Sequence, residues 1–325
     1  MIFDVARHRF SEGFLTLLFF AAMAMMVAFS ADPVVLTEGG APLQGSVETF
    51  AMKHPLLSSV AMLLLIGYSG LRFSRAAVRV GIYSASSLAP VALSGIAMFA
   101  CTTMSHYLLT MVVVWLVSEV FGRLLYCFGA NMRVGYLFTA MMSLGALPLV
   151  DGALIPLALV LPVVVIFVRG TLREAIITLV GVALPTFVYC YVVWLLGGEF
   201  NLAFTDVWSL EGSVAQHTAV LDYLTISRLV FLGLTLFANI CSIIVYHNVR
   251  VTLVDSARTI WRLLIALEIM LVAMLLLMPS ASPAVVATLV LVMTLVIPQL
   301  FIRVDVYAAT IIYLIWIVSA LATAL

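Results

Sequence analysis

The chain has 325 residues, of which 65% are hydrophobic and 9% are charged, and its mean hydropathy is +1.25. So few charged side chains cannot cover the surface of a soluble protein of this size, and the composition is typical of a chain embedded in a bilayer. The formal net charge is zero and no run of four or more Lys and Arg occurs, which argues against a nucleic-acid groove. We expect membrane lipids as partners and no nucleic acid.

A membrane-spanning helix needs about 20 mainly apolar residues, and this chain has eleven segments that approach or meet that length. We therefore predict an all-α, polytopic transmembrane bundle of about 11 spans, built as a single domain over residues 1–325. Only two connections are long, and we expect them to form loops near 31–54 and 197–228. The predicted spans, in chain order, cover residues 14–30, 55–71, 81–101, 105–121, 134–149, 152–168, 175–196, 229–246, 261–278, 284–300 and 307–324.

The basic residues predict the orientation of these spans, because Lys and Arg are retained on the cytoplasmic side. With the N-terminus in the cytoplasm, 13 of the 15 basic residues fall in cytoplasmic segments, and only Lys53 and Arg228 fall in outer ones. The outer connections collect eight of the 15 acidic residues. This alternation predicts a cytoplasmic N-terminus, two long loops on the outer side and, for a bacterial chain, a place in the inner membrane.

The first outer loop, within FSADPVVLTEGGAPLQGSVETFAMKHP, contains the first candidate site residues. Asp32 follows the predicted first span by two residues, and Glu38 lies further along the same loop. A carboxylate held at the depth of the lipid headgroups can act as a general base or a metal ligand on a lipid-linked substrate. The alternative is a solvated acidic loop without chemistry.

Three segments of the chain resemble corresponding parts of an uncharacterised family of polytopic inner-membrane proteins from Bacteroidota. They are NMRVGYLFTAMMSLGALPLVDGALIPLALVLPVVVIFVRG, TLREAIITLVGVALPTFVYCYVVWLLGG and RTIWRLLIALEIMLVAMLLLMPSAS. The middle section of that family looks like the GT-C glycosyltransferases, which implies a catalytic acid in the first outer loop and a polyprenyl-phosphate-linked substrate. Only Asp32 matches that position here, with Glu38 as the weaker match. The chain departs from the pattern because it has no adjacent acidic pair in this loop and no large outer domain.

Other ionisable residues are candidates for substrate binding. Glu268 lies within the predicted ninth span, where an acid costs about 2.5–3.5 kcal/mol, so we expect it to face the bundle interior. Two roles fit such a position: Glu268 binds a proton or a substrate, or it joins two helices by a hydrogen bond.

Asp151 is predicted to cap the short turn before the sixth span, as an N-cap residue does. It also belongs to the outer side, where His54, His106 and His217 occupy neighbouring connections. If these side chains converge, they form a carboxylate–imidazole cluster able to hold a divalent metal. Their spacing along the chain does not require convergence, and the sequence specifies no metal site and no cofactor.

Two further patterns describe the architecture. Arg72, Arg75 and Arg79 share one face if the helix continues through them, which allows contact with lipid phosphates but also follows from the positive-inside rule. Prolines within the apolar runs break or bend helices, and broken helices border cavities in transporters. In the second long loop, the aromatic residues near Phe200 to Trp208 predict a helix at the outer interface.

Two classes of function fit these observations. The first is a component or assembly factor of an envelope process, with other envelope proteins as partners. The second is a GT-C-like transferase or handler of polyprenyl-linked sugars, with transport as a more distant alternative. Whether the chain is an enzyme is left open by its sequence.

Overall fold

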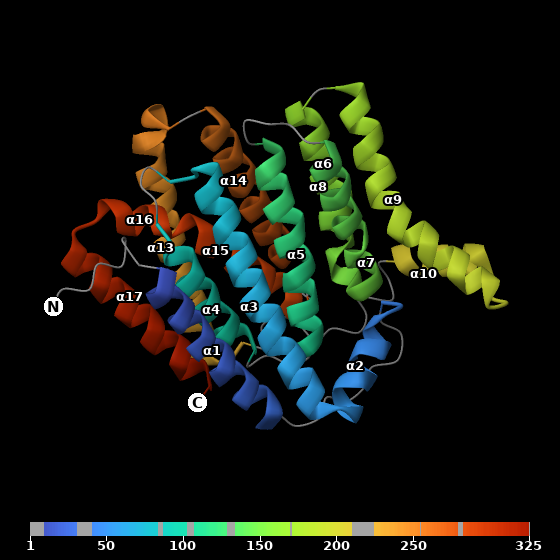
Figure 1. Ribbon diagram of the computed structural model, residues 1–325, viewed down its shortest axis with the longest axis horizontal. Coiled ribbons are helices and arrows are strands. Elements are labelled where there is room, and N and C mark those ends of the chain that lie inside the picture. Colours follow the sequence, from blue (N-terminus) through green and yellow to red (C-terminus); the bar gives the residue numbers. More distant parts are fainter. Residues whose placement is uncertain are drawn as a thin grey trace.

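The computed structural model contains only helices among the residues it describes, which are 10–30, 41–83, 87–102, 107–128, 134–169, 171–209, 224–253, 255–278 and 282–324 (Figure 1). The first part of the chain forms α1 (Phe10–Ser30), α2 (Gln44–Lys53), α3 (Pro55–Val80), α4 (Ala89–Thr102), α5 (Tyr107–Phe128), α6 (Val134–Gly145), α7 (Leu147–Val150), η2 (Gly152–Leu154), α8 (Ile155–Arg169), α9 (Leu172–Leu195) and α10 (Phe200–Trp208). The second part forms α13 (Ile226–Val249), η3 (Arg250–Thr252), α14 (Asp255–Leu277), α15 (Pro283–Val296), α16 (Pro298–Arg303), α17 (Val306–Leu321) and η4 (Ala322–Ala324).

Within the described residues, eight helices are long and apolar enough to cross a membrane, and three shorter apolar helices accompany them. Each of the eleven predicted segments overlaps one of these helices. The protein is therefore an all-α, multi-pass membrane protein, as its composition predicts.

Four predicted limits differ from the helix ends by six residues or more. The fourth segment was expected to end at residue 121 and the ninth to begin at residue 261, but α5 continues to Phe128 and α14 begins at Asp255. The two largest differences lie on either side of Gly81. The second span was expected to end at residue 71, but α3 continues to Val80 and ends at Gly81, whose φ of 70° provides the left-handed C-cap. The third segment was expected to begin at residue 81, but α4 begins at Ala89. The three arginines between 72 and 79 therefore lie on a helix, and their charge made this stretch look like a connection.

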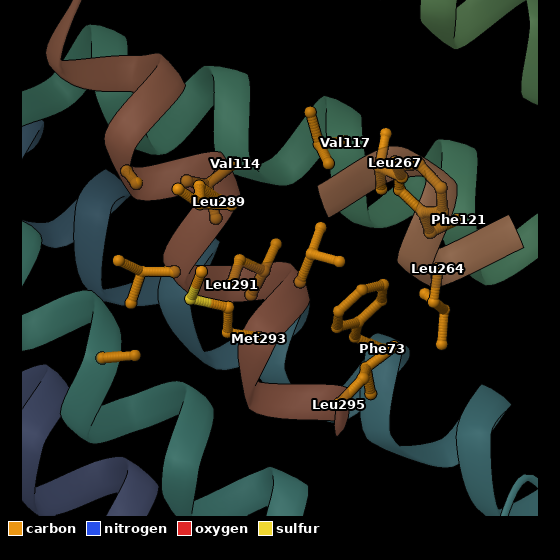
Figure 2. Packing of buried hydrophobic residues seen from close by; sticks show 14 of the residues in the cluster. Phe73, Val114, Val117, Phe121, Leu264, Leu267, Leu289, Leu291, Met293 and Leu295 are labelled. Carbon is orange, nitrogen blue, oxygen red and sulfur yellow. The ribbon is translucent and has the colours of Figure 1, made fainter. Parts of the chain in front are cut away.

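Two helices, α4 and α15, form the centre of the bundle, and every residue of both is buried. A helix that is apolar all round is stable only where other helices surround it on every side. Helix α4 packs against α1, α3, α15 and α17, while α15 also contacts α5, α13 and α14. Figure 2 shows one part of this core, where Leu289 of α15 lies near Val114 of α5 and Leu295 of α15 lies near Phe73 of α3.

The periphery exposes large apolar side chains instead of charged ones. Helix α9 is the clearest case, since Leu179, Phe187 and Trp194 are each more than half exposed. Helices α6 to α10 form the side of the bundle away from α1 and α17 (Figure 1). In water this surface would be a large aggregation-prone patch, so acyl chains are its natural solvent.

Both predicted long loops contain a short helix. Helix α2 lies in the first of them and turns Gln44 and Glu48 inward, where the Gln44 Nε2 donates a hydrogen bond of 3.1 Å to the Glu48 Oε1. Helix α10 lies in the second and packs against α9, with the rings of Phe187 and Phe200 5.8 Å apart. The predicted helix around residues 200–208 is confirmed.

Helices α6 and α9 approach closely because each presents a glycine to the other. A Cβ atom added at Gly145 would clash with the backbone carbonyl of Val182, and one added at Gly181 would lie 2.7 Å from the Met141 Cβ. The sequence has no two glycines four residues apart, so it lacks the usual helix-pairing signature. The contact uses one glycine from each helix and is visible only in three dimensions.

We predict that Gly145→Ala lowers the free energy of unfolding by about 1–3 kcal/mol, because the added methyl group overpacks a backbone contact that cannot yield. Gly135→Ala is the matched control, since a Cβ atom at Gly135 meets nothing within 4 Å. Thermal unfolding in detergent measures both. Equal melting temperatures for the two variants would contradict this packing.

Candidate functional site: an ionic cluster at a lateral crevice

Helices α3 and α5 run parallel, and the contacts along their seam follow one register. Near the start of both helices the Ser58 hydroxyl lies 2.9 Å from the Tyr107 hydroxyl, and further along the Tyr68 hydroxyl bonds to Glu119. The partners are 49 residues apart in the first pair and 51 in the second. This register brings residues that are far apart in sequence to the same depth of the bundle.

Glu119 is the centre of an ionic cluster on this seam. Its Oε1 accepts a hydrogen bond of 2.6 Å from the Tyr68 hydroxyl, and its Oε2 accepts one of 2.6 Å from the Arg123 Nε. The Arg72 Nε lies 3.2 Å from Oε1, as an ion pair without hydrogen-bond geometry. The Glu119 side chain is 5% exposed, so three neighbours replace the water it would otherwise hold.

The cluster carries an excess of positive charge. Two guanidinium groups share one carboxylate, and their side chains are 30% exposed at Arg72 and 27% at Arg123. Further along α3, the guanidinium of Arg79 lies 5.7 Å from the centre of the Tyr126 ring on α5. Helix α3 continues through all three arginines of the predicted stripe, and Arg72 and Arg79 are both turned toward α5.

A crevice of about 610 Å³ opens beside the cluster, between α5, α6 and α9. Glu119, Arg123 and Tyr68 line one end, and Leu43 and Leu149 line the other. The walls between them are mostly apolar and include Pro185, which lies inside α9. The remaining lining residues are Trp115, Leu116, Met142, Ser143, Ala146, Leu184, Val188 and Tyr189.

A second crevice, of about 450 Å³, lies on the other side of α9, between α8 and α10. Its lining includes the aromatic rings of Phe200, Phe204 and Trp208 and the proline inside α8, Pro162. Pro162 and Pro185, two of the prolines within the predicted apolar runs, thus each line a lateral crevice. This second crevice contains no charged side chain in its lining, so it lacks the ionic end of the first.

Asp151 has the structural role that its position predicts. It is the N-cap of η2, and its Oδ1 accepts a hydrogen bond of 3.0 Å from the backbone N–H of Ala153. Its Oδ2 accepts a hydrogen bond from the hydroxyl of Ser282, at the start of α15. Asp151 is 1% exposed, so both of its oxygens are used to tie two helix starts together.

The other described candidates, His54 and Glu268, have surroundings of their own. His54 is exposed at the junction of α2 and α3, where its ring lies 5.5 Å from that of Phe50. Glu268 is 4% exposed and accepts a hydrogen bond of 2.9 Å from Asn239, so the prediction that it faces the interior is confirmed. Asp32, Glu38 and His106 lie outside the described residues.

The described residues contain no group of three His, Cys, Asp or Glu side chains placed to hold a metal ion. Of the carboxylate–imidazole cluster considered from the sequence, only Asp151 and His54 are described, so the cluster stays a prediction. His217, like His106, lies outside the described ranges.

Glu119 was not singled out from the sequence, although a signal was present. The run WLVSEVFGRLLY places an acid and an arginine four residues apart within an apolar segment, the spacing of an ion pair on one helix face. Tyr68 and Arg72 have the same spacing on the neighbouring helix. The sequence does not show the alignment of α3 with α5 that brings the Tyr68–Arg72 pair against the Glu119–Arg123 pair.

Comparisons with known proteins return no relative. No family model, curated protein or solved structure matches the chain. The resemblance to the Bacteroidota family and to the GT-C glycosyltransferases gains no support from them and stays a prediction.

We predict that Glu119→Gln lowers the free energy of unfolding by about 1–3 kcal/mol, because it leaves two partly buried guanidinium groups without a counter-charge. The exposed pair of Asp255 and Arg258 provides the control, since the Asp255 side chain is 92% exposed. We expect Asp255→Asn to change the stability by about 0.5 kcal/mol or less. Thermal unfolding in detergent compares them, and equal losses would count against a structural role of Glu119.

Proposed function

We propose that this protein handles a lipid within the membrane, binding one anionic lipid with its chain in the crevice beside α9 and its headgroup at the Glu119 cluster. The observation that supports the proposal is the continuity of the two parts. The same crevice is apolar along its walls and ends at Arg123, Glu119 and Tyr68. A ligand that matches both parts has a long apolar chain and a negative head.

The walls of the crevice suit a hydrocarbon chain. Ligand sites in proteins have volumes of about 300–1,000 Å³ and are lined mainly by apolar side chains with a few polar groups that set the orientation. The 610 Å³ crevice fits this description, with Ser143 and Tyr189 among its polar groups. Because α9 exposes much of its surface to the bilayer, a chain can enter sideways from the lipid.

The ionic end suits an anionic headgroup. Arginine binds phosphate and carboxylate oxygens through paired N–H groups, and it does so best where water is scarce. Glu119 engages the Nε of Arg123 and neutralises only one of the two guanidinium charges. The remaining positive charge attracts an anion, while Glu119 and Tyr68 fix the position of the arginines.

The proposal includes the orientation expected from the sequence, with eleven crossings and a cytoplasmic N-terminus. Contacts between helix ends support it, because they join segments that were assigned to the same side. On the cytoplasmic side, the Tyr83 hydroxyl donates to the Leu295 oxygen and the Trp261 Nε1 to the Ile82 oxygen.

On the outer side, Ser282 donates to Asp151, and the backbone N–H of Leu43 donates to the Leu149 oxygen. In the proposed orientation, the Arg123 end of the crevice would face the cytoplasmic side of the inner membrane and the Leu43 end the outer side. The headgroup would then come from the cytoplasmic leaflet.

Lipid handling is compatible with both classes of function suggested by the sequence. A component of an envelope process would bind the lipid as a structural or transported ligand. A transferase acting on polyprenyl-linked sugars would need, in addition, an acid such as Asp32 on the outer side. The aromatic residues of α10 beside the second crevice favour a lipid-facing platform on that side.

Retained lipid tests the proposal. Mass spectrometry of the protein purified in mild detergent should detect an anionic lipid bound at a fixed stoichiometry. We expect Ser143→Trp, which fills the crevice, to reduce its retention about tenfold, equivalent to about 1.4 kcal/mol. Arg123→Gln should remove the preference for anionic over zwitterionic lipid, because it deletes a charge-assisted contact.

Val180→Trp is the matched control, because Val180 is 51% exposed on α9 but does not line either crevice. It should retain lipid as the unmodified protein does. Equal retention by Ser143→Trp and Val180→Trp, at equal amounts of monodisperse protein, would refute binding in this crevice.

Cysteine labelling in intact cells tests the orientation. We expect Ser46→Cys, on the exposed face of α2, to react with an impermeant maleimide from outside. Val251→Cys, which is 81% exposed in η3, should react only after the cells are lysed. The unmodified chain is the control, since Cys101, Cys127 and Cys190 are buried. Reversed reactivity of the two variants would overturn the assigned orientation.

A further inference from the structure

The seam between α13 and α14 contains a second intramembrane carboxyl group, which the lipid site does not use. Asn239 of α13 donates from Nδ2 to the Glu268 Oε2 of α14, over 2.9 Å. The rings of Tyr246 and Trp261 stack across the same seam with their centres 4.5 Å apart. Tyr246 follows Asn239 by seven residues on α13, and Trp261 precedes Glu268 by seven residues on α14. The two contacts therefore lie on the same faces of two antiparallel helices, about two turns apart.

Two oxygens of this polar pair have no hydrogen-bond partner in the described part of the chain. They are the Glu268 Oε1 and the Asn239 Oδ1, and both are buried. The two residues are themselves 4% and 3% exposed. Two buried acceptors on adjacent, bonded side chains are costly, because each loses its water without gaining a donor.

One added proton gives both of these oxygens a hydrogen bond. A carboxylic acid and a primary amide pair reciprocally, with the amide N–H donating to one carboxyl oxygen and the acid O–H donating to the amide oxygen. The first of these bonds is present, and the two oxygens without partners are the two atoms that the second bond would join. We propose that Glu268 and Asn239 form a proton-binding site, in which Glu268 holds its proton on Oε1 and donates it to the Asn239 Oδ1.

The surroundings of Glu268 favour the neutral acid. Among the described residues, no cation lies within ion-pair distance of its carboxyl group, in contrast to the two arginines at Glu119. Helix α15, which packs against both α13 and α14, has no titratable residue. The titratable residues on α13, α14 and the other elements packed against them are Tyr107, Glu119, Arg123, Tyr126, Cys127, Arg169, Arg228, Cys241, Tyr246, His247, Arg250, Asp255, Arg258, Arg262, Arg303, Tyr307 and Tyr313.

The proton also determines how the two helices are held. With the acid neutral, two reciprocal hydrogen bonds join α13 to α14 at mid-depth. Loss of the proton leaves a single bond and places a charged oxygen opposite an amide oxygen, which repel each other. Helices α13 and α14 both pack on α15, so release of the proton weakens one side of the central core.

Infrared spectroscopy of the full-length protein in detergent at neutral pH tests the site. We expect the unmodified protein to show a carbonyl band of a protonated carboxylic acid that Glu268→Gln removes. In Asn239→Leu the band should remain but shift, because the acid loses its amide partner. If the unmodified protein has no such band, or if Glu268→Gln leaves it in place, Glu268 is not protonated and the proposal fails. A band that does not shift in Asn239→Leu would exclude the reciprocal pair.

Thermal unfolding supplies a second test that does not depend on the spectrum. The amide side chain introduced by Glu268→Gln can pair reciprocally with Asn239, so we expect the melting temperature of this variant at neutral pH to equal that of the unmodified protein. At alkaline pH the unmodified protein should lose stability relative to this variant. Glu268→Ala and Asn239→Leu should each melt several degrees lower at neutral pH. A Glu268→Gln variant as unstable as Glu268→Ala would overturn the proposal.

Discussion

The absence of water inside a bilayer is the constraint on which the rest of this structure depends. Every polar side chain placed there must find its partner within the protein, because lipid offers no hydrogen bonds. Glu119 is held by groups from α3 and from its own helix, and Glu268 is held by Asn239 of α13. Asp151 joins the start of η2 to that of α15. These three buried acids are therefore also cross-links of the bundle.

The same constraint explains the contrast between the two sides of the molecule. Around α4 and α15 the helices are packed on all sides, and polar atoms such as the Ser242 hydroxyl donate to carbonyls of neighbouring helices. Around α9 the packing is thinner, since crevices flank the helix on two sides and a close glycine contact holds it to α6. A lipid can be accommodated at α9 without disturbing the core.

The two intramembrane carboxyl groups illustrate two solutions to one electrostatic problem. Glu119 keeps its charge because guanidinium groups lie within 3.2 Å of it. Glu268 has an amide in place of a cation, and an amide is best matched by a neutral acid. The difference lies in the partner and not in the degree of burial, which is similar for both.

The sequence by itself determined the class of the protein and the approximate positions of its helices, because hydropathy measures how well each stretch tolerates lipid. It also placed Glu268 toward the interior, since the cost of an exposed acid in hydrocarbon leaves few alternatives. Asp151 was predicted as a cap from its place before a helix start. The end of the second predicted span was placed too early, before Arg72 to Arg79. Charged residues end an apolar run in the sequence, but they do not end a helix.

Only the tertiary structure decided which residues meet. The cluster at Glu119 depends on the parallel register of α3 and α5, and the Asn239–Glu268 pair on the antiparallel register of α13 and α14. Neither register is encoded in a local pattern, because the apolar faces of neighbouring membrane helices can pack at several offsets with similar energy. The crevice beside α9 likewise brings together side chains of α5, α6 and α9 that are far apart in the sequence, so it exists only once these helices are assembled.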